Sequence, residues 1–151
     1  MFRSAAMLFV IATLLATACG QRIQAPVAIN GTQTCQYCRQ EVRDQRFAAE
    51  LVAPGMEPIF FDDVGCLSAY LMRNSVMPRY AVAYVADHRT HEWITAGSAI
   101  YTTGARIETP AGSRVLAHAS VESRNADPLA LDGTAVSFSS LFPLAPPDGY
   151  R

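Results

Sequence analysis

Two cysteines, Cys35 and Cys38, lie two residues apart in the stretch NGTQTCQYCRQEV. A thiolate is the softest ligand that a side chain offers, and a pair at this spacing can reach one Cu(I) or Zn(II) ion. The same spacing occurs in redox-active dithiols, but these place the first cysteine at a helix N-terminus. Here the pair leads towards a strand-like run. We therefore expect a metal site first. The alternatives are a structural Cys35–Cys38 disulfide in a protein that acts as a non-metal interaction module, and the redox dithiol of a thiol oxidoreductase.

Further soft ligands are available elsewhere in the chain. Cys66 lies in the first turn of a predicted helix, where it is either a third thiolate or a small buried hydrophobe. Met56 lies in a predicted hairpin turn and Met77 in a loop, and a thioether at either position would suit Cu(I). Met72 recurs at helical spacing and is expected in the core.

The histidines and paired aspartates are weaker candidates. His88 and His91 flank a predicted turn, where we expect solvated side chains rather than ligands. His118 alternates with apolar residues in VLAHAS, which favours a core or edge histidine over a metal ligand. Asp62 and Asp63 precede the predicted helix, so one is expected to cap it rather than to catalyse.

The N-terminus has the layout of an export signal: Arg3, an apolar run, small residues and then Cys19. The ending LATACG resembles a bacterial lipobox. This predicts a signal peptide over residues 1–18, a lipid on Cys19, and a periplasm-facing protein of the cell envelope, in either membrane. The alternative is a soluble secreted protein with Cys19 left spare. A lipidated Cys19 leaves three thiols, and an odd number favours a use for them other than disulfides.

The composition excludes some functions. The net charge is −1 and no basic run exists, so nucleic-acid binding is not expected. No nucleophile elbow, phosphate-binding glycine loop or His-Glu-x-x-His motif is present, so no enzyme activity is predicted.

The hydrophobic pattern predicts an α+β fold. Residues 19–34 read as a flexible tether and 143–151 as a frayed tail. Between them, strands over 46–53 and 57–63, a helix over 63–74 and a strand over 79–87 form a β-β-α-β unit. The second half repeats this order loosely, with strands expected over 91–96, 99–104 and 113–120. We expect one domain, 35–142, of two small packed β-β-α-β units.

The order of these motifs resembles the NosL family of nitrous-oxide-reductase accessory lipoproteins. The resemblance rests on the lipobox, Cys-x-x-Cys, FDDVGC, YVADHRTHEWITAGSAIY and TPAGSRVLAHAS. It implies a Cu(I)-binding metallochaperone that assists a periplasmic copper enzyme such as nitrous-oxide reductase. It also makes His118 the histidine nearest the metal. The family motifs continue as Cys-x-x-Cys-Gly-Met and Thr-Pro-Met-Gly, whereas this chain has Arg39, Gln40 and Ala111 at the corresponding positions.

Overall fold

The computed structural model describes residues 24–74 and 78–143. The predicted signal peptide, Cys19, Met77 and all but the first residue of the predicted tail lie outside these ranges. Among the described residues, no helix is long and apolar enough to cross a membrane.

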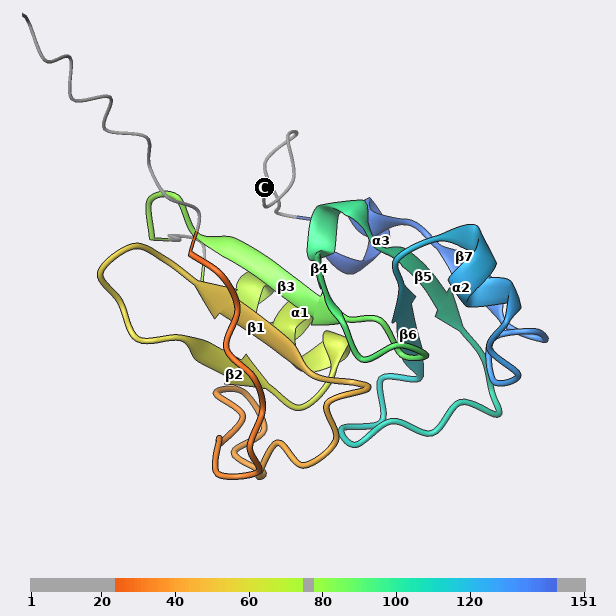
Figure 1. The fold of residues 1–151 in the computed structure, drawn as a ribbon, viewed down its shortest axis with the longest axis horizontal. Helices are drawn as coiled ribbons and strands as arrows, with labels where there is room; N and C mark the ends of the chain where they lie inside the picture. The colour runs from red at the N-terminus through yellow and green to blue at the C-terminus, as the bar shows by residue number, and fades with distance from the viewer. Residues whose placement is uncertain (1–23, 75–77, 144–151) are drawn as a thin grey trace, which may run out of the picture.

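The first half of the domain forms the predicted β-β-α-β unit (Figure 1). Its elements are β1 (Ala49–Val52), β2 (Ile59–Phe61), α1 (Val64–Arg73), β3 (Val82–Ala86) and the added strand β4 (Trp93–Thr95). All strands pair antiparallel in the order β2-β1-β3-β4. The predicted N-cap is confirmed, because the Asp63 side chain accepts the backbone N–H of Cys66.

The second half repeats this arrangement after the 3₁₀ turn η1 (Ala96–Ser98). Its elements are β5 (Ile100–Thr103), β6 (Val115–His118), α2 (Val121–Asn125), β7 (Thr134–Val136) and the short helix α3 (Phe138–Leu141). The sheet order is β6-β5-β7, so the first strand of each unit is flanked by the second and the last. The α+β class and the two β-β-α-β units are confirmed.

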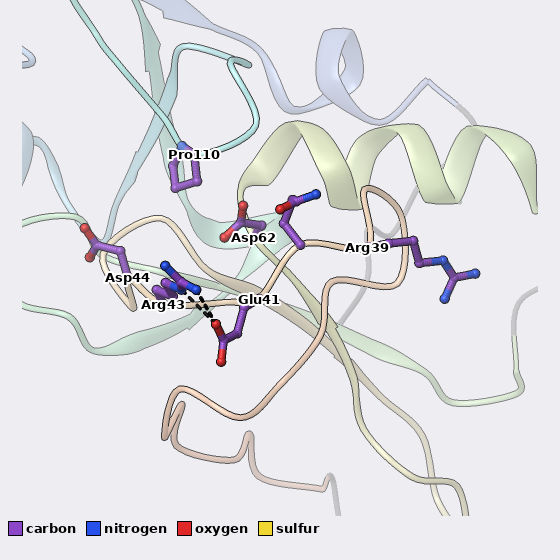
Figure 2. A pocket seen from close by; sticks show the side chains of 7 residues that line it. Arg39, Glu41, Arg43, Asp44, Asp62 and Pro110 are labelled. Carbon is purple, nitrogen blue, oxygen red and sulfur yellow. Dashed lines mark hydrogen bonds and ion pairs between the residues drawn. The ribbon is translucent and has the colours of Figure 1, made fainter.

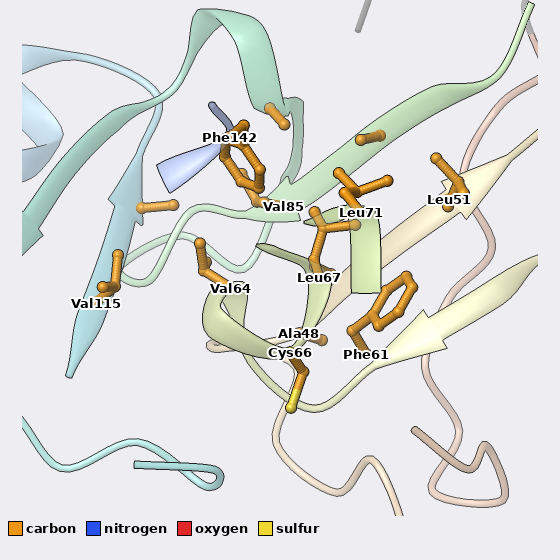
Figure 3. Packing of buried hydrophobic residues seen from close by; sticks show 14 of the residues in the cluster. Ala48, Leu51, Phe61, Val64, Cys66, Leu67, Leu71, Val85, Val115 and Phe142 are labelled. Carbon is orange, nitrogen blue, oxygen red and sulfur yellow. The ribbon is translucent and has the colours of Figure 1, made fainter. Parts of the chain in front are cut away.

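One apolar core joins the two units (Figure 3). The buried face of α1 contributes Val64, Leu67 and Leu71, which lie between the first sheet and β6. The second unit adds side chains of β5, β6 and the segment after α3: Tyr101, Val115, Ala117 and Phe142. Burial of this shared surface fixes the start of α1 relative to the second sheet.

The opposite face of the first sheet is covered by the segment that begins at Gln24 (Figure 1). Along β1, Ala49 and Leu51 belong to the shared core, so Glu50 points to the other face. Its carboxylate accepts the backbone N–H of Val27 at 2.9 and 3.1 Å, and Tyr84 donates to the carbonyl of Gln24. In the described part of the predicted tether, residues 24–34, these hydrogen bonds hold Gln24 and Val27 against the sheet.

Candidate metal centre

The two cysteines of the Cys-x-x-Cys stretch lie in a closed loop. Thr34 and Glu41 form an isolated β-bridge at its base, and the Cys35 N–H donates to the Gln40 carbonyl at 2.8 Å. Arg39 has φ of 67°, in the left-handed region that favours glycine. The NosL-like motif has glycine at this position, whereas here a residue with a Cβ adopts the left-handed conformation at a local backbone cost. The closed loop orients both sulfurs towards α1.

A backbone hydrogen bond attaches this loop to the first sheet. The Gln36 N–H donates to the carbonyl of Phe60 on β2 at 2.8 Å. Because α1 begins directly after β2, the bond brings Cys35 to the N-terminal turn that carries Cys66. The third cysteine thus joins the pair through the β2–α1 connection.

The three thiols lie close together. The sulfur atoms of Cys35, Cys38 and Cys66 all lie within 4.8 Å of one another, and all three cysteines are free. Cys35 is fully buried and Cys66 is 3% exposed, whereas Cys38 is partly exposed. The structural disulfide between Cys35 and Cys38 is therefore not formed in this structure. The arrangement offers two enclosed sulfurs and one that an approaching group can reach.

The cluster also separates the proton affinities of its thiols. The hydrogen bond from the Cys66 thiol, acting against burial, lowers the pKa of Cys35 from 9.0 to about 5. The same hydrogen bond and burial raise the pKa of Cys66, and burial raises that of Cys38. Cys38 also donates its backbone N–H to the Cys35 sulfur at 3.4 Å. Near neutral pH the centre holds one thiolate, supported by hydrogen bonds, and two thiols.

The loop that carries TPAGS holds the start of α1 in place. Asp63, whose Oδ1 caps α1, uses Oδ2 to accept the Thr109 hydroxyl at 2.7 Å and the Ser113 N–H at 3.3 Å. Gly65 allows the close approach, because a Cβ there would lie 2.4 Å from the Cβ of Ser113. The FDDVGC and TPAGS motifs are therefore two sides of one contact that positions Cys66.

A polar pocket of about 470 Å³ lies beside the cysteine loop (Figure 2). Its lining comes from the segment after Cys38, from the end of β2 and from the TPAGS loop: Arg39, Gln40, Glu41, Arg43, Asp44, Asp62 and Pro110. Burial, with smaller effects of the charges on Cys35 and Asp63, raises the pKa of Asp62 to about 6. The pocket gives solvent and partner groups a route to the flank of the loop.

Two predicted ligands lie away from the thiols. Met56 is 46% exposed in the β1–β2 turn. It lies at the opposite end of β2 from α1, and five extended residues span about 16 Å. His118 is not part of the thiol group and is fully buried in the second unit. Its expected position near the metal is therefore wrong, because β6 carries it towards the end of β3.

A second polar cluster was not predicted from the sequence. His88, His118 and Asp127 lie together, and His88 is 6% exposed instead of solvated as expected. Burial opposes ionisation of Asp127, but hydrogen bonds from His118 and His88 outweigh it and hold the pKa of this carboxyl below its ordinary value. The apolar alternation around His118 correctly indicated burial, but no local pattern pairs residues 30 and 39 positions apart.

The fold and the thiol centre define a small α+β protein with a candidate site for a soft metal ion. The family model for NosL matches residues 26–141, so the chain belongs to the NosL family. This is a family of copper-associated accessory proteins rather than of enzymes, and the three-cysteine cluster is compatible with a metal site. No curated protein matches the chain closely enough to be reported as a relative.

Proposed function

We propose that the protein binds Cu(I) through Cys35, Cys38 and Cys66 and passes it to a copper enzyme. The observation that carries this proposal is the convergence of three free sulfurs within 4.8 Å. Thiolates favour soft ions such as Cu(I) and Zn(II) over hard cations, and three of them supply a trigonal ligand set that suits Cu(I). Gln40 and Ala111 carry no thioether, so the proposed site uses thiolates alone.

The different exposure of the three thiols determines which sulfur an incoming ligand replaces when copper is transferred. Cys35 and Cys66 are enclosed and hold the ion, whereas Cys38 is the ligand that an incoming group can replace. The transfer is a ligand exchange in which a donor of the client enters as the Cys38 sulfur leaves. No electron is transferred, and the copper remains Cu(I).

The same burial pattern argues against thiol oxidoreductase activity. An attacking thiol needs both a low pKa and access to its substrate. Here the low pKa belongs to the fully buried Cys35, and the accessible Cys38 has a raised pKa. The cysteine that could attack is therefore the one that remains protonated near neutral pH.

The place of action and the client extend this proposal. A lipid on Cys19 would hold the domain at the membrane, facing the periplasm of a bacterial cell envelope. The client would be a periplasmic copper enzyme such as nitrous-oxide reductase. Labelling with a radioactive fatty acid, lost in Cys19→Ala, tests the anchor. Nitrous-oxide reductase recovered copper-depleted from cells lacking this protein supports that client, and fully loaded enzyme contradicts it.

An anaerobic Cu(I) titration against a competing chelator tests the binding step. Wild-type protein should hold one Cu(I) at nanomolar free metal, as thiolate sites do. Cys35→Ser and Cys66→Ser should each weaken binding strongly, whereas Met56→Ala, a matched loss of an exposed sulfur, should not. Unchanged affinity in both serine variants contradicts the proposal.

A further inference from the structure

A second group of potential metal ligands lies apart from the thiols. His88 follows β3 of the first sheet, His118 ends β6 of the second, and Asp127 follows α2. Their exposed fractions are 6%, 0% and 3%. Three segments distant in sequence thus bring two imidazoles and a carboxylate together in the interior.

The two rings converge on one oxygen atom. His88 Nδ1 lies 2.5 Å and His118 Nε2 lies 2.9 Å from Oδ2 of Asp127. The other carboxylate oxygen, Oδ1, accepts the Leu129 N–H at 3.0 Å, which fixes the orientation of the group. This is the support that a ligating carboxylate has in metal sites, where a hydrogen bond to the second oxygen sets its direction.

Neither ring has another polar partner. His88 Nε2 and His118 Nδ1 are buried without a hydrogen-bond partner within the described residues. A buried polar atom left unpaired costs about 1–3 kcal/mol, so a pair of buried histidines whose only polar contact is one shared oxygen is a costly way to fill a core. A cation at the point of convergence would not pair these two atoms, but it would give the facing nitrogens, His88 Nδ1 and His118 Nε2, and Oδ2 of Asp127 a shared partner.

We propose that His88, His118 and Asp127 form a second metal site, which takes a divalent cation of the zinc type and joins the two sheets. Two nitrogens and one carboxylate oxygen suit Zn(II), whereas the soft thiol centre selects Cu(I). Ligand atoms about 2.0–2.1 Å from a tetrahedral ion lie roughly 3.3 Å apart, so both histidine contacts with Asp127 have to open, that of His88 more than that of His118.

Each ring has to present an unprotonated nitrogen to the ion, because a ligating histidine is neutral. Each neutral ring carries its proton on the nitrogen that faces away from the ion, at His88 Nε2 and His118 Nδ1. These atoms lack the acceptors that usually support ligating histidines, and the loss of such support costs about 10- to 100-fold in affinity. The site therefore binds zinc more weakly than a fully supported zinc site does. Because the site is enclosed, the bound ion would stabilise the fold.

Zinc binding to the mature protein with Cys35→Ser, Cys38→Ser and Cys66→Ser tests the proposal independently of the copper function. Folding is checked by circular dichroism. Equilibrium dialysis should give about one Zn(II) per chain, with X-ray absorption showing ligands at about 2.0–2.1 Å and no sulfur at about 2.3 Å. Adding His118→Gln or Asp127→Asn should abolish this binding. Adding His91→Gln, which changes the exposed histidine three residues after His88, should leave the binding intact.

Two results overturn the proposal: a folded serine variant that binds no zinc, or binding that survives His118→Gln. If the serine variant does not fold, the same measurement is made on the protein with its cysteines intact. About two equivalents with mixed sulfur and nitrogen ligands, falling to one in His118→Gln, support the site. A single sulfur-bound equivalent in both proteins shows that the histidines form only a hydrogen-bonded core.

Discussion

Asp63 accepts a 2.7 Å hydrogen bond from the hydroxyl of Thr109, which lies 46 residues further along the chain. The other oxygen of the same carboxylate caps α1 at the N–H of Cys66. One side chain therefore holds the TPAGS loop of the second unit and the third thiol of the first. The geometry of the metal centre depends on this contact between the two units.

Replacing Asp63 should damage both stability and copper binding. Asp63→Ala removes a cap and leaves buried donors unpaired, at a cost of about 2–4 kcal/mol of unfolding free energy. Because Cys66 loses its anchor, Cu(I) affinity should fall as well. The matched control is Ser120→Ala, which removes the cap of α2 away from the thiols. If both variants lose stability but Cu(I) affinity is unchanged in each, Asp63 does not position the site.

The cysteine loop should be improved by restoring glycine at residue 39. Arg39 has φ of 67°, and a residue with a Cβ pays about 1–2 kcal/mol there. Arg39→Gly should therefore raise the unfolding free energy in urea by about 1 kcal/mol. Arg39→Ala removes the hydrogen bond to Gln36 equally but keeps the Cβ, and it should show no gain. Equal stability of the two variants would mean that the loop carries no backbone cost.

Glu50 predicts a fall in stability as pH rises. Burial raises its pKa from 4.5 to about 7, so between these values the folded protein holds a proton that the unfolded chain has lost. The unfolding free energy should fall across this window by up to about 3 kcal/mol. Glu50→Gln, which stays uncharged and can still accept from Val27, should remove most of the fall, as measured by urea unfolding at several pH values.

The control for this pH dependence is Glu57→Gln, which changes an exposed carboxyl in the connection between β1 and β2. It should leave the fall intact. Because the lowered pKa of Cys35 makes the unfolding free energy rise with pH over part of the same window, the test is the difference between the wild type and Glu50→Gln. The same pH dependence in these two proteins would show that Glu50 is ionised without cost.

Copper affinity should depend steeply on pH. Cys35, with a pKa of about 5, is already a thiolate near neutral pH, whereas Cys38 and Cys66 have raised pKa values and must each release a proton to the solvent on binding. The logarithm of the Cu(I) affinity should rise by about two per pH unit between roughly pH 6 and 8. A slope near zero would show that the ion does not use these two thiols.

The sequence carried enough information for the element order but not for every contact. Alternation, turn residues and the Asp63 cap predicted the first unit, because these signals are local. The second unit was predicted only loosely, and the strand expected in it over 91–96 is β4 of the first sheet. The docking of Val27 on Glu50 was missed, since a backbone N–H leaves no mark in the sequence and Glu50 looked like an ordinary strand carboxylate. That Glu50 is buried and pairs with this N–H followed only once the structure showed which face of β1 carries it.

The same limit applies to the metal centre. The Cys-x-x-Cys spacing pointed to two of its three cysteines, but the approach of Cys66 depends on the bond between Gln36 and Phe60 across separate elements. His118 was expected near the copper because of the family resemblance, and the register of β6 against β5 instead carries it to Asp127. Long-range register decides such questions, and no local motif encodes it.

The central claim is that one Cu(I) ion is held by three thiolates. X-ray absorption at the copper edge, on anaerobically loaded wild-type protein and on Cys66→Ser, tests it most directly. We predict a nearest shell of three sulfur atoms in the wild type and of two in Cys66→Ser. A wild-type shell of two sulfurs that is unchanged by Cys66→Ser, or a shell dominated by nitrogen and oxygen, would contradict it.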